Sequence, residues 1–177
     1  MKHSVLKWEL IGIAVISVVG SALHFLFELS GEWPPVGVIA AVNESVFEHL
    51  KLTFWPTVVY AAATYALLRK SAKNFIIAKT VAVYVMPVTI IVLFYGYTTL
   101  TGIESVIIDI LIFIVAVAVG QLVSYRMLIM EQLPQWLKWL SMVFLVILAV
   151  IYGLFTFYPP HVDFFMDSAT GSYGIPQ

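Results

Sequence analysis

One short part of the chain combines imidazole and carboxylate side chains at helical spacings. His24 and Glu28 are four residues apart. Glu44 and Glu48 repeat this spacing, and His49 follows directly. Residues four apart lie one turn from each other on the same face of a helix. Neutral imidazole and carboxylate groups are ligands for zinc, manganese and ferrous iron, so these residues indicate a divalent metal site.

A metal at this position would suit a membrane hydrolase that acts on a lipid-like substrate. The ion would polarise a carbonyl or phosphoryl oxygen and activate water, while a second carboxylate accepts a proton. We expect one of Glu44 and Glu48 to be a metal ligand and the other to be the general base, which makes both candidate catalytic residues. The candidate metal ligands are His24, Glu28, Glu44, Glu48, His49 and His161. Neither the H-E-x-x-H motif of zinc proteases nor the E-x-x-H pairs of di-iron bundles is present, so the pattern selects no particular ion among the three.

The same residues also have plainer interpretations. Glu44, Glu48 and Lys51 are equally compatible with the solvated face of a loop, where an ion pair contributes little to stability. His24 is equally compatible with a hydrogen bond to a neighbouring helix. Two further functions therefore stay open: a protein that binds or transports a cation or a proton, and an accessory structural subunit of a membrane complex.

The composition places the whole chain in a membrane. Of its 177 residues, 62% are hydrophobic and 11% are charged, with a mean hydropathy of +0.99, whereas soluble domains carry about 25% charged residues. We therefore predict a single integral membrane domain over residues 1–177, in contact with membrane lipid. The net charge of −1 argues against a nucleic-acid partner, and the lack of cysteine excludes thiolate sites. Nothing in the sequence identifies a membrane partner or decides whether the chain forms a homo-oligomer.

The predicted fold is all-α. Apolar runs predict five transmembrane helices at about 9–29, 52–68, 75–98, 103–124 and 136–158. Residues 36–51 follow two prolines and are too short to span comfortably, so we expect a short amphipathic or re-entrant helix there, or one that continues into the next helix. Residues 159–177 form a tail outside the membrane.

Polar residues within the predicted spans indicate which helix faces meet protein. Ser17, Ser21, His24 and Glu28 form one stripe, which must face other helices or water because lipid leaves polar groups unsatisfied. Gly20 beside this stripe would let a neighbouring backbone approach closely. Further along the chain, we expect Asp109 to accept a hydrogen bond from a Thr or Tyr hydroxyl, and Lys79 to extend to the nearer membrane surface.

The basic residues predict the orientation. With a cytoplasmic N-terminus, five crossings place eight of the nine Lys and Arg residues on the cytoplasmic side, in agreement with the positive-inside rule. The expected location is the cell membrane, with a multi-pass topology and the C-terminus outside. This topology brings the histidines and most acids to the outer end, where His161, Asp163 and Asp167 of the tail could cover the metal site or add a ligand.

Several motifs resemble an uncharacterised family of small prokaryotic integral membrane proteins. They are the run Gly20-Ser21-x-Leu23-His24-Phe25-x-x-Glu28, the run from Asn43 to Leu52 containing N-E-S-x-x-E-H-L-K, and the pair Pro159-Pro160-His161 and Tyr173-Gly174-Ile175 in the tail. Phe47 stands where the family pattern has Trp, and Ala41 where it often has Pro. The resemblance implies a helical bundle and carries no known activity.

Overall fold

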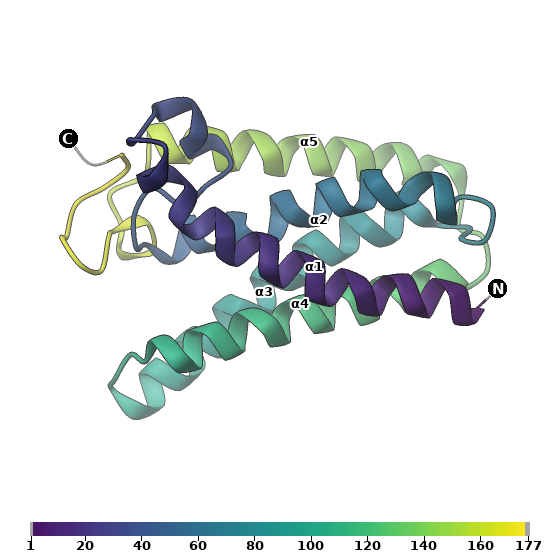
Figure 1. Cartoon of the computed structure of the whole chain (residues 1–177), viewed down its shortest axis with the longest axis horizontal. Coiled ribbons are helices and arrows are strands. Elements are labelled where there is room, and N and C mark those ends of the chain that lie inside the picture. Colours follow the sequence, from purple (N-terminus) through teal and green to yellow (C-terminus); the bar gives the residue numbers. More distant parts are fainter. Residues whose placement is uncertain (1, 176–177) are drawn as a thin grey trace.

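The computed structural model describes residues 2–175 and confirms the all-α fold class. The elements, in chain order, are α1 Lys2–Leu29, η1 Pro34–Val38, α2 Val46–Leu68, α3 Phe75–Thr101, α4 Val106–Ile129, α5 Gln135–Phe157 and η2 Asp163–Phe165, where η denotes a 3-10 helix. The described residues contain no β-strand, only an isolated bridge between Met166 and Tyr173. The long helices extend along the length of the molecule, and the N-terminus and the C-terminal tail lie at opposite ends (Figure 1).

Four of the five long helices have the length and composition of membrane spans. These are α1, α3, α4 and α5, with mean hydropathies between 2.2 and 2.8. The remaining predicted span, at residues 52–68, corresponds to α2 and does not belong to this group. Its apolar run is interrupted by Trp55, Pro56 and several Thr and Tyr residues, and much of the helix is buried among the other elements. The chain is therefore a multi-pass membrane protein with at least these four helices able to cross.

Residues 36–51 do not form the predicted amphipathic or re-entrant helix. Only Pro34–Val38 make a short 3-10 helix, residues 39–45 are irregular, and residues 46–51 are the first turns of α2. The side chains before α2 explain this break. Asn43 Oδ1 accepts the N–H of Ser45 at 2.9 Å, and Ser45 Oγ caps α2 by accepting the N–H of Glu48 at 3.3 Å. A capped helix start at residue 46 leaves the preceding chain free to form a loop.

Gly20 lets the backbones of α1 and α2 approach each other closely, as its position beside the polar stripe predicted. A Cβ atom on Gly20 would lie 2.5 Å from the carbonyl oxygen of Leu52 and 2.6 Å from the ring of Phe113. Only glycine leaves room for this contact between the two backbones. Because His24 lies one turn beyond Gly20, the contact holds its side chain against the start of α2.

Two charged residues within the helices have partners in the bundle. Asp109 accepts the hydroxyl of Tyr97 at 2.7 Å, as predicted. Lys79 does not extend to the surface, which corrects the prediction: it is 4% exposed and contacts both carboxylate oxygens of Glu9 at 2.7 Å. The nearby carboxylate of α1 gives the ammonium group a partner inside the bundle, so that it has no need to reach water.

Candidate metal centre

Three potential ligand atoms converge at the end of the bundle where α1 meets the start of α2. The Nε2 atoms of His24 and His49 are 3.1 Å apart. Oε2 of Glu44 lies 3.5 Å from Nε2 of His24 and 3.4 Å from Nε2 of His49. The three ligands come from three different elements, namely α1, the loop before α2, and α2 itself.

The spacing of the three atoms suits a small divalent ion. A triangle with sides of 3.1, 3.4 and 3.5 Å has a circumradius of about 1.9 Å, so a point about 0.7 Å above its plane is about 2.05 Å from all three atoms. Zinc–nitrogen and zinc–oxygen bonds have lengths of roughly 2.0–2.2 Å. An ion at that point would keep at least one coordination position free on the side away from the triangle.

The backbone of the loop fixes the orientation of the His49 ring. Nδ1 of His49 lies 2.8 Å from the carbonyl oxygen of Ser45. A carbonyl can only accept, so Nδ1 carries the hydrogen and the lone pair of a neutral ring is on Nε2, which faces Glu44 and His24. Such a bond from the second ring nitrogen is the usual support of a metal-binding histidine. His24 lacks this support, because its buried Nδ1 has no hydrogen-bond partner among the described residues.

The three side chains of the cluster also affect one another's protonation. A hydrogen bond from His24, followed in size of effect by one from His49, holds the pKa of the Glu44 carboxyl well below its usual range. Burial lowers the pKa of His49, but the hydrogen bonds to Glu44 and to the Ser45 carbonyl outweigh it and raise that pKa above the ordinary value. The cluster therefore holds a carboxylate anion next to an imidazole that takes up a proton readily, and a metal ion would have to displace that proton to bind His49.

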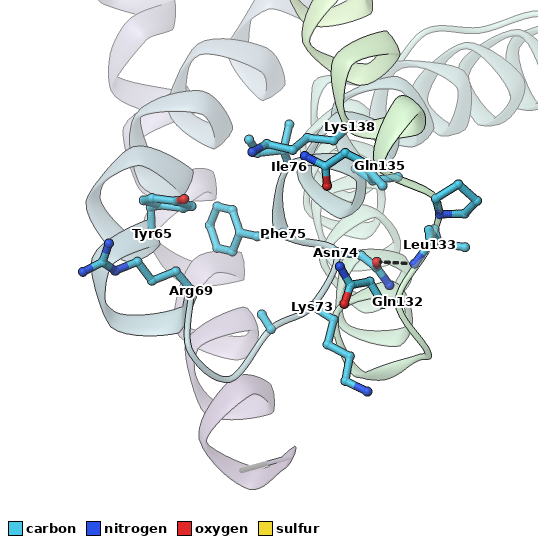
Figure 2. A pocket seen from close by; sticks show the side chains of 13 residues that line it. Tyr65, Arg69, Lys73, Asn74, Phe75, Ile76, Gln132, Leu133, Gln135 and Lys138 are labelled. Carbon is cyan, nitrogen blue, oxygen red and sulfur yellow. Dashed lines mark hydrogen bonds between the residues drawn. The ribbon is translucent and has the colours of Figure 1, made fainter.

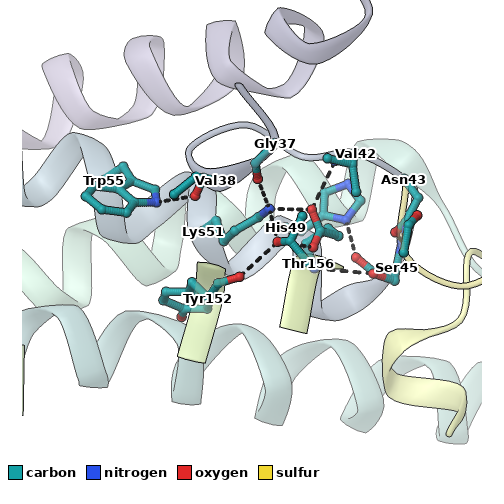
Figure 3. Close-up of polar contacts among 12 residues, drawn as sticks. Gly37, Val38, Val42, Asn43, Ser45, His49, Lys51, Trp55, Tyr152 and Thr156 are labelled. Carbon is teal, nitrogen blue, oxygen red and sulfur yellow. Dashed lines mark hydrogen bonds and ion pairs between the residues drawn. The ribbon is translucent and has the colours of Figure 1, made fainter. Parts of the chain in front are cut away.

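Glu48 and Lys51 form a buried pair behind the cluster, and the interpretation of these two residues as a solvated face is wrong. Glu48 is 2% exposed and Lys51 is 0% exposed. The Lys51 ammonium contacts Oε2 of Glu48 and donates to the carbonyl of Gly37 and the hydroxyl of Thr156, both at 2.7 Å (Figure 3). Three acceptors satisfy all three N–H groups of the lysine.

The carboxylate of Glu48 has both oxygens engaged. Oε2 accepts the N–H of Val42 at 3.0 Å in addition to Lys51, and Oε1 accepts the hydroxyl of Thr156 at 3.0 Å. Glu48 is thus directed away from the three converging ligand atoms and holds the loop that carries Glu44. This arrangement gives Glu48 a positioning role for Glu44, and it brings Thr156, which the sequence did not single out, next to the site.

The two remaining predicted ligands lie outside the cluster. Glu28 is exposed on α1. His161 is exposed in the tail, where its ring stacks on Tyr173 with centroids 4.5 Å apart. The structure brings His24, Glu44 and His49 together and leaves these two residues apart from them.

The C-terminal tail forms hydrogen bonds to the loop that carries Glu44, through residues other than His161, Asp163 and Asp167. The side-chain amide of Asn43 donates to the carbonyl of Gly174 at 2.8 Å, and the Ser168 hydroxyl donates to the carbonyl of Glu44 at 3.2 Å. Asp167 is buried and bonds within the tail, to the N–H of Ala169 at 2.9 Å among others. The tail therefore supports the site by holding its loop in place.

These features define a multi-pass helical membrane protein with a His–Glu–His cluster at one end of its bundle. The chain belongs to the family of unknown function DUF6512, whose sequence model matches residues 1–175, and this confirms the resemblance to an uncharacterised family. No curated protein and no solved structure matches the chain.

Proposed function

We propose that this protein holds a divalent transition metal on His24, Glu44 and His49 and that it is a metal-dependent hydrolase of a lipid-like substrate. The observation that carries the proposal is the convergence of two imidazole nitrogens and one carboxylate oxygen within 3.5 Å of each other. Sites with three protein ligands and an open position are typical of catalytic zinc, whereas structural zinc sites are closed by four ligands.

The exposure of the cluster favours catalysis over a purely structural metal. The side chains of His24, Glu44 and His49 are 27%, 49% and 34% exposed, so a substrate can reach the ion from the membrane surface. A divalent ion at this point would lower the pKa of a bound water to near 7 and polarise an ester or phosphoryl oxygen. Both oxygens of Glu48 are engaged, so Glu48 would not act as the general base. A metal held by His24, Glu44 and His49 would itself supply the activation of water, with solvent taking up the proton.

The proposed topology has five crossings, with α2 as the fifth span. The cytoplasmic side would hold the N-terminus and most basic residues, and the metal centre would face outward near the C-terminal tail. The opposite positions of the two termini support an odd number of crossings (Figure 1). The protein would then meet its substrate in the outer leaflet.

A transport function has less support from the packing. The side chains of Ile16, Met86 and Val117 are all 0% exposed and belong to one apolar cluster in the middle of the bundle. The hydroxyls of Thr57 and Thr64 donate to carbonyls of their own helix, so they offer no free polar path. Both observations count against a route for a cation or proton from the cluster inward.

Metal analysis of purified protein tests the proposal. We expect about one equivalent of zinc, manganese or iron in the wild type and a loss of at least tenfold in His24→Ala, Glu44→Ala and His49→Ala. His161→Ala is the matched control, because it removes an exposed histidine outside the cluster and should keep the metal. Wild-type protein that folds but binds none of the three ions under saturating supply would refute the metal centre and favour the accessory-subunit alternative.

Hydrolysis is tested separately with metal-loaded protein in vesicles. Ester and phosphodiester lipids are the substrates to screen, with release of the acyl or headgroup product as the measurement. Activity that depends on Glu44 and on added metal would support the hydrolase. A loaded centre that hydrolyses neither class would refute the reaction and leave the metal site standing.

A further inference from the structure

A polar cavity of about 160 Å³ (Figure 2) lies where α2 ends, at the end of the bundle opposite the proposed metal centre. It forms where the loop between α2 and α3 meets the loop between α4 and α5. Asn74, which is 3% exposed, joins the two loops: its amide donates to the carbonyls of Met127 and Glu131, and its oxygen accepts the N–H of Leu133 at 2.9 Å. These three bonds give the cavity a fixed wall.

The cavity is electropositive. Arg69, Lys73 and Lys138 line it, and no acidic residue does. Within the described residues, none of these three cations forms an ion pair. Their charges are therefore available to an anion that enters the cavity.

Two helix N-termini add to this potential. The first residues of α3, Phe75 to Ile77, and the first residue of α5, Gln135, are part of the lining. Neither helix has a side-chain cap or an acidic residue in its first turn. Helix N-termini carry partial positive charge and attract phosphate, which strengthens the effect of the three basic side chains.

An apolar cavity of about 390 Å³ continues from the polar one. The two share Tyr65, Phe75 and Ile76, and the second extends between α2 and α3 along residues such as Val58 and Val83. Its volume is within the usual range for small-molecule sites. A charged compartment at the end of the bundle joined to an apolar one along its helices matches the two parts of a phospholipid.

We propose that the two cavities together bind one phospholipid with an anionic headgroup. The phosphate would lie among Arg69, Lys73 and Lys138, and an acyl chain would lie in the apolar cavity. Basic pockets between transmembrane helices are known to bind acidic lipid headgroups. This site is independent of the proposed metal centre, which lies at the other end of the bundle.

Native mass spectrometry of the detergent-purified full chain tests the proposal, with phosphatidylglycerol and phosphatidylcholine of equal chain length as probes. We expect one phosphatidylglycerol to be retained in preference to phosphatidylcholine. Each basic side chain near a membrane surface contributes about fivefold to binding, so R69Q/K73Q/K138Q should weaken retention roughly 100-fold, and K138Q alone about fivefold. The single variant keeps the test valid if the triple variant does not fold.

The matched control is K7Q/K70Q/R126Q, which removes three charges at the same end of the bundle from residues outside the cavity. It should retain the lipid like the wild type. Equal losses in the two triple variants, or no preference for phosphatidylglycerol, would overturn the proposal. Ala62→Trp fills the apolar cavity and should also weaken retention. If Ala62→Trp has no effect and inorganic phosphate displaces the bound lipid, the site is one for free phosphate and the phospholipid assignment is wrong.

Discussion

Replacing Lys51 by methionine should be the most costly single change near the proposed metal centre. Methionine keeps most of the side-chain volume and removes the charge, which leaves the Glu48 carboxylate buried at 2% exposure without its cation. Removing one partner of a buried ion pair typically costs about 3–5 kcal/mol. The carbonyl of Gly37 also loses its donor, which places the expected loss near the upper half of that range.

The free energy of unfolding can be measured by titrating detergent-purified protein from dodecyl maltoside into SDS and following helix content. Lys51→Met should lower it by about 4 kcal/mol, whereas the double variant Glu48→Gln/Lys51→Met should recover part of the loss because the buried charge is gone. Lys7→Met, an exposed lysine in α1, is the matched control and should change the value by less than about 0.5 kcal/mol. A loss below about 1 kcal/mol for Lys51→Met, or a double variant that is no more stable than the single one, would refute the buried-pair reasoning.

Three further changes probe the geometry of the site. Gly20→Ala forces the α1 and α2 backbones apart, so it should cost about 1–3 kcal/mol in the same SDS titration and lower metal content, whereas Gly96→Ala, which meets open space, should be neutral. His49 has a raised pKa in the folded state. Its contribution to the stability of chelator-treated protein is therefore complete below about pH 6.5 and is lost as the pH rises through the raised pKa. Melting temperatures should fall over that pH range in the wild type but not in His49→Gln. Asn43→Ala removes the bond to Gly174, and should at least halve the metal retained after dialysis against a weak chelator while α-helix content stays unchanged.

The sequence predicted the helices well because hydropathy and proline positions are local signals. The break between residues 39 and 45 was not predicted, since the apolar residues of that stretch fit a helical stripe and the hydrogen bonds of Asn43 and Ser45 decide otherwise. α2 was predicted as a span of the same kind as the others. Its lower hydropathy reflects a helix that packs largely against protein.

Part of the candidate site could be predicted and part could not. The i,i+4 spacings identified His24 and Glu44, and the imidazole directly after Glu48 identified His49. The fold does bring these three residues together. The same spacing wrongly grouped Glu48 with them, because its partner Thr156 lies 108 residues away and no local pattern reports a contact of that range. Glu9 and Lys79, 70 residues apart, were missed as a pair for the same reason.

The bond between Asn43 and Gly174 joins residues 131 positions apart and has a consequence for biosynthesis. His24, Glu44 and His49 leave the ribosome early, but Thr156 and Gly174, which hold their loop, are synthesised more than 100 residues later. A nascent chain therefore carries the ligands for most of its synthesis without the framework that orients them. Loading of the proposed metal centre should therefore require synthesis through residue 174, and chains arrested before residue 156 should capture no metal.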